Sequence, residues 1–369
     1  MPCTNRIKGR KYPQEEFRSI LVRGTNWIGD CVCSLPALRV IRRSFPSAEL
    51  TLMVKPWVAG IYQPSKLIDH LLIYDRSGEY RGAKGFLSVV RQLRKGGYEL
   101  AILFQNAFQA AALTFLARIP HRWGYATDGR GFLLTRALPV NKETLRRHHV
   151  YYYTELLRGL GIAEEEPPQM ELLIDEGAKE KMKQILLNSG VSWERPLVGI
   201  NPGAAFGPAK RWLPERFAEV ADRLEQSADC RVVVVGSTRE QDIARKMTSF
   251  MKSTPIVLTG KTTLQELIAV ISLCQLFISN DSGPMHLAAA LKVPTIGIFG
   301  PTDERITAPW GEGHSVISKQ LDCRPCQLAD CPTEHRCMKA ITAEEVYSVA
   351  RQKLTETERL KSADKGADL

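Results

Sequence analysis

Three glycine-bearing segments of this chain carry residue types that could bind a phosphorylated ligand. The segment 201–212 (NPGAAFGPAKRW) follows an expected strand and combines two glycines with the cations Lys210 and Arg211. Exposed backbone N–H groups beside a fixed cation can hold a diphosphate, because both stabilise its negative charge. A surface loop with ordinary solvated cations is the alternative. The helix that Pro214 starts directly afterwards favours the phosphate site.

The segment 279–291 (SNDSGPMHLAAAL) is the most informative of the three. An apolar strand ends here and a helix starts near Pro284, so free N–H groups at the helix start would attract an anion. Asp281 and Ser282 are expected to cap this helix. His286, in the first turn, is predicted to contact the ligand, with a purely structural histidine as the alternative.

The third segment, 23–30 (RGTNWIGD), joins a strand to a helix and ends in Asp30. Its glycine spacing is not that of a dinucleotide-binding G-x-G-x-x-G loop. A plain strand-to-helix turn capped by Asp30 explains this segment equally well. The stretch 260–263 (GKTT) resembles the end of a P-loop, but Pro255 occupies the position that needs glycine, which excludes a Walker-type ATPase.

Apolar runs alternate with helical patterns along the chain, which predicts parallel sheets wrapped by helices. Ligands bind such sheets at the carboxyl ends of the strands, where the three segments lie. The acidic, proline-bearing stretch 163–169 (AEEEPPQ) predicts a boundary between two domains, 18–170 and 171–355, followed by a polar tail, 356–369, that should fray. The expected strands are 19–22, 49–54, 71–74, 100–104, 197–200, 231–235, 256–258, 276–279 and 295–299.

The composition is that of a soluble globular protein with 369 residues, 44% of them hydrophobic and 24% charged. No apolar stretch approaches the roughly 20 residues that span a bilayer, and the N-terminus lacks the apolar core of a secretory signal. We therefore expect a cytoplasmic protein. The formal net charge of +10 favours acidic partners, and without a nucleic-acid-binding signature it points to phosphorylated molecules or an anionic membrane face.

Four of the nine cysteines crowd into one short segment: Cys323, Cys326, Cys331 and Cys337, with His335 among them. Four thiolates could hold zinc tetrahedrally. The segment lacks the two separated C-x2-C knuckles of common zinc ribbons, so reduced structural thiols or disulfide-capable pairs are favoured over a metal.

Four motifs in this order and spacing resemble the ADP-heptose:lipopolysaccharide heptosyltransferases of glycosyltransferase family 9. They are RGTNWIGDCVCSLPAL, NPGAAFGPAKRWLPERF, VVVVGSTREQ and ISNDSGPMHLAAAL. The resemblance covers about residues 18–355 and is greatest to the heptosyltransferase II branch, whose first loop has the same form. It implies an α/β fold of the glycosyltransferase B type, with two Rossmann-like domains facing a central cleft. The N-terminal domain would bind the acceptor and the C-terminal domain the nucleotide sugar.

The implied reaction moves L-glycero-D-manno-heptose from ADP-heptose to the first heptose of the lipopolysaccharide inner core, with inversion at the anomeric carbon. An inverting transfer needs one base for the acceptor hydroxyl, and Asp30 matches the base proposed for the family. ADP leaves with negative charge that must be stabilised, and Lys210 matches the residue that contacts the diphosphate. The resemblance implies no cofactor and no metal.

The same resemblance assigns the donor site. Asp281 matches an acidic residue that holds hydroxyls of the donor sugar, while His286 and the N–H groups of Ser282 and Gly283 would lie near the phosphates or the sugar.

The nucleoside half of the donor is assigned in the same way. Glu240 matches a carboxylate that binds the ribose hydroxyls, although Asp242 is close enough in sequence to take that role. Thr262 falls where the family contacts adenine.

The acceptor implied by the resemblance is a phosphorylated lipid A–inner-core molecule, which would place the enzyme peripherally on the inner face of the cytoplasmic membrane. One alternative is a heptosyltransferase with another acceptor, such as a heptosyltransferase I. Another is a nucleotide-sugar-binding protein without turnover, against which Asp30, Lys210 and Asp281 together argue. Candidate acceptor-binding cations are Arg122, Arg130, Arg136, Arg146 and Arg147.

Overall fold

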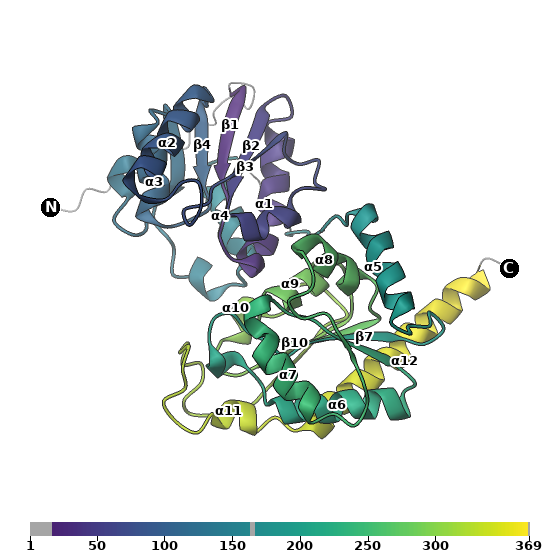
Figure 1. The fold of residues 1–369 in the computed structure, drawn as a ribbon. Helices are drawn as coiled ribbons and strands as arrows, with labels where there is room; N and C mark the ends of the chain where they lie inside the picture. The colour runs from purple at the N-terminus through teal and green to yellow at the C-terminus, as the bar shows by residue number, and fades with distance from the viewer. Residues whose placement is uncertain (1–16, 163–166, 368–369) are drawn as a thin grey trace. The chain divides into compact units, whose positions relative to one another are not determined.

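The computed structural model describes residues 17–162 and 167–367. The chain folds into two compact units, Met1–Gln169 and Met170–Leu369, each built around its own sheet (Figure 1). Part of the boundary stretch expected at 163–169, namely residues 163–166, lies outside the described residues.

The first unit is a parallel sheet of six strands in the order β3-β2-β1-β4-β5-β6. Its central strands β1 and β4 are buried over nearly their whole length, because helices cover both faces of the sheet. The strands are β1 Ser19–Arg23, β2 Glu49–Val54, β3 His70–Ile73, β4 Leu100–Leu103, β5 His121–Tyr125 and β6 Arg136–Leu138. The helices are α1 Ile28–Ser44, η1 Pro56–Ile61, α2 Gly82–Lys95, α3 Phe108–Leu116, η2 Gly131–Leu133, η3 Thr144–Arg146 and α4 Val150–Gly159.

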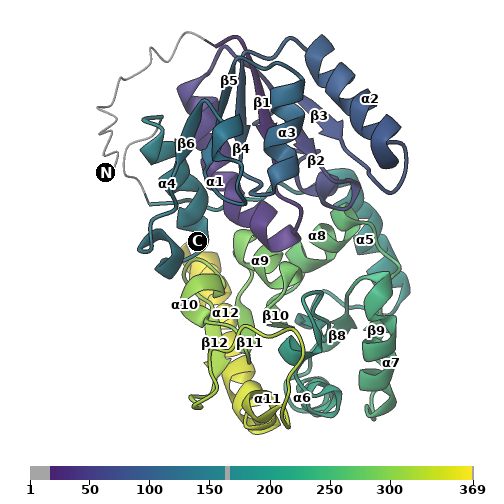
Figure 2. The ribbon, with the colours of Figure 1, turned by 90° about the vertical axis from the view of Figure 1, so that its left-hand side faces the viewer.

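The second unit repeats this topology with strands β7 to β12, in the order β12-β11-β10-β7-β8-β9 (Figure 2). Its strands are β7 Leu197–Asn201, β8 Arg231–Val234, β9 Ile256–Val257, β10 Leu276–Asn280, β11 Thr295–Phe299 and β12 Ser315–Ser318. Its longer helices are α5 Glu176–Asn188, α6 Pro214–Ser227, α7 Gln241–Ser249, α8 Leu264–Ser272, α9 Gly283–Ala290 and α12 Ala343–Ala367. Short helical turns complete it: η4 Pro208–Lys210, η5 Thr238–Glu240, α10 Glu304–Thr307 and α11 Arg336–Lys339.

Both sheets contain a topological switch point, where consecutive crossovers leave in opposite directions. It lies between β1 and β4 in the first unit and between β7 and β10 in the second. Ligands of open parallel sheets bind beside such points, at the carboxyl ends of the strands. The segments after β1, β7 and β10 are the three that the sequence singled out.

All nine expected strands are present, with ends shifted by at most one residue. The sequence reading did not include α3, β5, β6 or β12. Helix α1 begins at Ile28, so Asp30 lies in its first turn.

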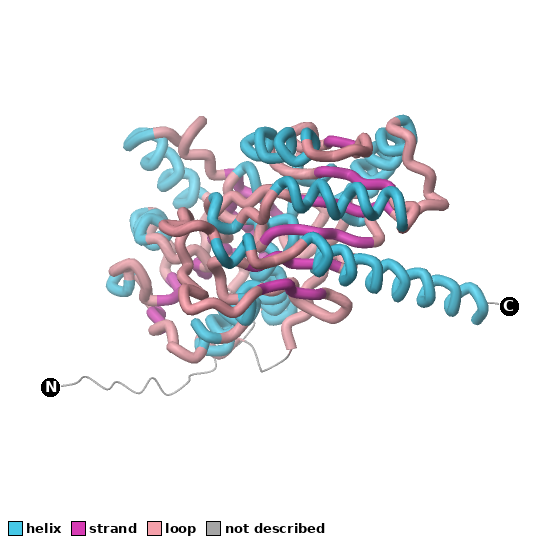
Figure 3. The backbone as a smooth tube through the Cα atoms, turned by 90° about the horizontal axis from the view of Figure 1, so that it is seen from below, coloured by secondary structure: helices cyan, strands magenta, loops and turns pink. Residues whose placement is uncertain are grey.

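The tail expected to fray from residue 356 onward is instead helical as far as Ala367, as the last part of α12 (Figure 3). Its alanine, glutamate, lysine and arginine residues are strong helix formers. Contacts one turn apart add to this, because Gln352 donates a hydrogen bond to Glu356 at 2.8 Å.

Candidate active site

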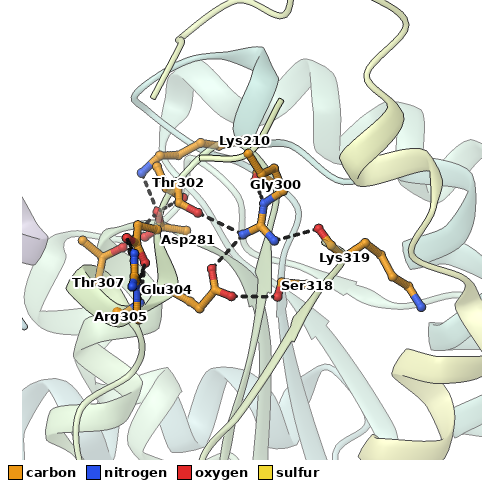
Figure 4. A network of polar contacts seen from close by, with 11 residues as sticks. Lys210, Asp281, Gly300, Thr302, Glu304, Arg305, Thr307, Ser318 and Lys319 are labelled. Carbon is orange, nitrogen blue, oxygen red and sulfur yellow. Dashed lines mark hydrogen bonds and ion pairs between the residues drawn. The ribbon is translucent and has the colours of Figure 1, made fainter. Parts of the chain in front are cut away.

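An ion pair joins two of the three predicted ligand-binding segments. Lys210 ends η4, in the segment after β7, and Asp281 directly follows β10. The Lys210 Nζ atom lies 2.6 Å from Asp281 Oδ2, and the two side chains are only 12% and 4% exposed (Figure 4). Lys210 and Asp281, predicted to contact the diphosphate and the donor sugar, therefore lie on the same edge of their sheet and in contact.

Two threonines hold the Asp281 carboxylate in place. Thr302 and Thr307 both donate hydroxyl hydrogen bonds to its Oδ2 atom, at 2.7 and 3.3 Å (Figure 4). Both belong to the segment after β11, the strand next to β10. Three donors, Lys210 and the two threonines, therefore converge on one oxygen and fix the orientation of the carboxylate. The sequence analysis missed these threonines, although their place after a buried strand was the available signal.

Two buried asparagines connect the segments after β7 and β10. Asn201 donates to the Ser282 hydroxyl at 2.8 Å and accepts from the Gly203 N–H at 3.2 Å. Asn280 accepts from the Trp212 N–H at 2.9 Å and donates to the Pro202 carbonyl at 2.9 Å. The bonds to Pro202, Gly203 and Trp212 give partners to backbone groups of the segment after β7. The sequence analysis gave neither asparagine a role, although each ends its strand.

The start of α9 differs from the expected arrangement. Ser282 occupies the N-cap position, yet α9 has no side-chain cap among the described residues. The Ser282 hydroxyl accepts a hydrogen bond from Asn201, and the Asp281 carboxylate pairs with Lys210. The prediction that these two residues cap the helix is therefore wrong. Gly283 is the first helical residue and His286, in the first turn, is 5% exposed.

Glu240 and Asp242 occupy very different surroundings. Glu240 is 8% exposed, and its Oε2 atom accepts from the N–H and the hydroxyl of Ser237, each at 2.7 Å. Its carboxylate also lies against Gly203, where a Cβ atom would come within 2.0 Å of Oε1. Asp242 is 89% exposed and paired with Arg245. Only Glu240 lies beside the segment that follows β7.

Thr262 lies in the turn between β9 and α8, next to the segment that carries Glu240. The Gly260 N–H donates to the Gly236 carbonyl at 2.9 Å and joins the two turns. Glycine at position 260 permits this close approach for two reasons. Its φ is +73°, and a Cβ atom there would lie 2.5 Å from the Gln241 amide. The turn therefore brings the predicted ribose and adenine residues to neighbouring strand ends.

In the first unit, Asp30 is paired with a histidine that the sequence analysis did not consider. Trp27, and not Asp30, occupies the N-cap position of α1, and Asp30 lies three residues later in the first turn. Asp30 Oδ1 lies 3.5 Å from His149 Nδ1, with both side chains about one-third exposed. The His149 ring stacks on Tyr153, with centroids 5.5 Å apart. Burial and the nearby charge of Asp30 raise the pKa of Tyr153 well above its ordinary value.

Four of the five arginines considered for the acceptor make intramolecular contacts. Arg122, Arg130 and Arg136 donate to backbone carbonyls of their own unit, and Arg130 is completely buried. Arg147 pairs with Glu155 at 2.6 Å. These contacts give the four arginines structural roles in the first unit.

The cysteine-rich segment 323–337 contains Arg324, which contacts the loop that holds the Lys210–Asp281 ion pair. Cys323, Cys326, Cys331 and Cys337 are free thiols, and within residues 17–162 and 167–367 no three His, Cys, Asp or Glu side chains form a metal-binding group. Arg324 is 3% exposed and donates to the Thr302 carbonyl at 3.0 Å and to Glu304 at 2.8 Å. It thereby anchors the segment whose threonines hold Asp281.

Comparison with known proteins gives a consistent result. The model of "Glycosyltransferase family 9 (heptosyltransferase)" matches residues 86–336. Lipooligosaccharide heptosyltransferase 2 of Campylobacter jejuni is 31% identical over 91% of this chain and 98% of its own length. Lipopolysaccharide heptosyltransferase 2 of Salmonella typhimurium is 30% identical over 81% of this chain and 87% of its own length.

The structure of E. coli ADP-heptose LPS heptosyltransferase II matches with a TM-score of 0.77 and 27% identity, covering 92% of this chain and 99% of that one. This match confirms the B-type fold predicted from the sequence. In the part of the chain that the structure describes, no helix has the length and apolar character to cross a membrane. The family match covers more than half of the chain, and the chain belongs to glycosyltransferase family 9, the heptosyltransferases.

Proposed function

We propose that this enzyme transfers L-glycero-D-manno-heptose from ADP-heptose to the first heptose of the lipopolysaccharide inner core, inverting the anomeric carbon. The relatives that support this acceptor carry the name heptosyltransferase 2, and a matching structure is that of an ADP-heptose enzyme. The observation that carries the proposal is the ion pair of Lys210 and Asp281 at the switch point of the second sheet.

The second unit binds the donor in this proposal. Lys210 neutralises the diphosphate, and the N–H groups at Ser282 and Gly283 add donors at the start of α9. Asp281 accepts hydrogen bonds from hydroxyls of the heptose, and His286 lies near the phosphates. Glu240 accepts from the ribose hydroxyls through Oε1, since Oε2 is engaged by Ser237.

Thr262 contacts the adenine in the same proposal. The turn that carries it is joined to the turn before Glu240, so base and ribose would bind at neighbouring strand ends.

The first unit supplies the base. The acceptor hydroxyl oxygen attacks the anomeric carbon while the bond from that carbon to the diphosphate oxygen breaks, and its electron pair leaves with ADP. Asp30 takes the hydroxyl proton, with His149 positioning its carboxylate. Lys210 stabilises the charge that develops on the departing diphosphate.

An ADP-release assay with a series of acceptors tests this function. ADP-heptose is offered with inner-core acceptors that carry no heptose, one heptose or two heptoses. The proposal expects rapid release of ADP only with the acceptor that carries one heptose. Preference for the heptose-free acceptor would instead assign the heptosyltransferase I reaction.

The acceptor is an acidic lipid, so we further propose that the enzyme docks peripherally on the cytoplasmic face of the inner membrane. The net charge of +10 supports attraction to an anionic surface. Flotation with anionic liposomes should carry the protein upward at low salt and less so at high salt, because salt screens such attraction. Equal recovery with neutral liposomes would contradict this docking.

A further inference from the structure

Lys55 is a nearly buried lysine of the first unit whose ammonium lies among aromatic rings and other cations. It directly follows β2 and is 8% exposed. Its Nζ atom lies 4.2 Å from the centroid of the Tyr74 ring. Among the described residues none accepts a hydrogen bond from this ammonium or forms an ion pair with it. An ammonium has three donors, and withdrawing them from water without acceptors is costly.

The surroundings of Lys55 are positively charged. Burial, followed by the charges of Arg23 and Arg76, lowers the pKa of Lys55 to about 8, while Asp75 alone acts in the opposite direction. The two Nη atoms of Arg23 are engaged, because they donate to the Met53 carbonyl at 3.0 Å and to Asn26 Oδ1 at 3.0 Å, while its buried Nε atom has no partner among the described residues. Lys55 is thus a cation of this group whose ammonium donors are all available, in a place that favours an anion.

This group lies on the ligand-binding edge of the first sheet. Arg23 ends β1, Lys55 follows β2 and Tyr74 follows β3. These three strands are neighbours in one parallel sheet, so their carboxyl ends lie side by side.

Trp57, two residues after Lys55, adds an exposed aromatic face. Its side chain is 53% exposed, and its Nε1–H donates to the Asn26 carbonyl at 2.7 Å. The hydrogen bond fixes the indole and satisfies its polar atom, so the exposed part is apolar surface. The Lys55 ammonium lies 5.9 Å from the centroid of this ring. Asn26 and Asp30 both belong to the segment 23–30, so the Trp57 indole is hydrogen-bonded to the segment that carries the proposed base.

We infer that Lys55 and Trp57 form a subsite for a phosphorylated sugar of the acceptor. The Lys55 ammonium binds the phosphate, and the Trp57 indole packs against the sugar ring that carries it. A buried cation that has no acceptor among the described residues and a fixed, exposed indole face are the two features that such a ligand needs. The inference rests on the proposed function, because it assigns the acceptor side of the same reaction.

The test measures binding of a deacylated acceptor oligosaccharide to the full-length enzyme without donor, by calorimetry. The oligosaccharide is used with its phosphates and again after phosphatase treatment. Lys55→Met and Lys55→Gln should each weaken binding of the phosphorylated form about tenfold or more, the usual size of a lost charge-assisted hydrogen bond. Binding of the treated form should change less than about twofold. Trp57→Leu should weaken both forms.

Lys95→Met is the matched control, because Lys95 is exposed at the end of α2, before β4, and thus at the opposite edge of the sheet. It should bind both forms as the wild type does. Equal weakening of both forms by the two Lys55 variants would overturn the phosphate assignment, as would unchanged binding. Melting temperatures confirm that each variant is folded. Wild-type enzyme that binds the oligosaccharide but transfers no heptose would refute the proposed function and leave the subsite standing.

Discussion

Lys210 and Asp281 are 71 residues apart in the sequence, yet a 2.6 Å ion pair joins Lys210 Nζ to Asp281 Oδ2. The pair forms because β7 and β10 are neighbours at the switch point of the second sheet, so the segments that follow them meet. Each partner is nearly buried, which strengthens the attraction and makes an unpaired partner costly. A diphosphate that binds here would find its cation already oriented.

Replacement of this lysine should affect the chemical step most strongly. In the proposed mechanism Lys210 stabilises the charge of the departing ADP, so kcat of Lys210→Met in the ADP-release assay should fall by about 10² to 10³. Lys246→Met, at an exposed position of α7, is the control and should leave kcat unchanged. A Lys210 variant with a normal kcat would remove this residue from the proposed mechanism.

The assignment of Glu240 predicts a selective loss of ADP affinity. Glu240→Gln should weaken ADP binding by about 10- to 100-fold, because hydrogen bonds from the ribose hydroxyls to a charged acceptor are lost. Binding of 2′,3′-dideoxy-ADP should change little, since that ligand lacks both hydroxyls. Titration calorimetry with the two nucleotides measures the difference. Asp242→Asn is the control, and the assignment fails if both nucleotides lose affinity equally in the Glu240 variant.

The pairing of His149 with Asp30 predicts a change in kcat without a change in donor binding. His149→Asn should lower kcat about tenfold, because the Asp30 carboxylate loses the ring that positions it. The KM for ADP-heptose should stay within about twofold of the wild type. His70→Asn is the control, because His70 pairs with Glu49 at the amino ends of the strands. A His149 variant that changes only KM would contradict the positioning role.

His314 predicts a pH dependence of stability in the second unit. Burial, followed by the charge of Lys353, lowers the pKa of His314 to about 4, while the unfolded chain has the ordinary value near 6.5. Below pH 6.5 the unfolded chain binds a proton that the folded unit does not. The free energy of unfolding should therefore fall between pH 6.5 and about 4, by about 3 kcal/mol in total.

His314→Gln should flatten this acid limb, which melting curves between pH 4 and pH 8 would measure. A loss of packing in the variant lowers its free energy of unfolding equally at every pH, so it does not affect the comparison of the two pH slopes. An identical pH dependence in variant and wild type would contradict the predicted contribution of His314.

The sequence predicted most of the fold because its buried strands are continuous apolar runs. Strands β2 and β11 match their expected bounds at both ends. The short strands β6 and β12 were not predicted because they contain no continuous apolar run. They lie at sheet edges, where most of their residues are only partly buried. The polar end of α12 was misread because composition distinguishes a solvated helix poorly from a frayed tail.

The candidate site was predictable where chemistry follows directly from a motif. Lys210 and Asp281 were singled out as candidates because each lies in a glycine-bearing segment after a strand. Thr302 and His149 were not predicted, because each contacts a residue that is distant in the sequence. Only the fold brings Thr302 to Asp281 and His149 to Asp30. The arginines considered for the acceptor were chosen by charge alone. Charge does not reveal that Arg130 is buried and donates to a backbone carbonyl.

The most direct test of the account is a single-turnover measurement on Asp30→Asn with saturating ADP-heptose and a one-heptose acceptor. The substitution keeps the shape of the side chain but abolishes its ability to accept the proton. We predict a transfer rate about 10² or more below that of the wild type, with the Kd for ADP-heptose unchanged. Transfer at the wild-type rate would contradict the assignment of Asp30 as the base that activates the acceptor.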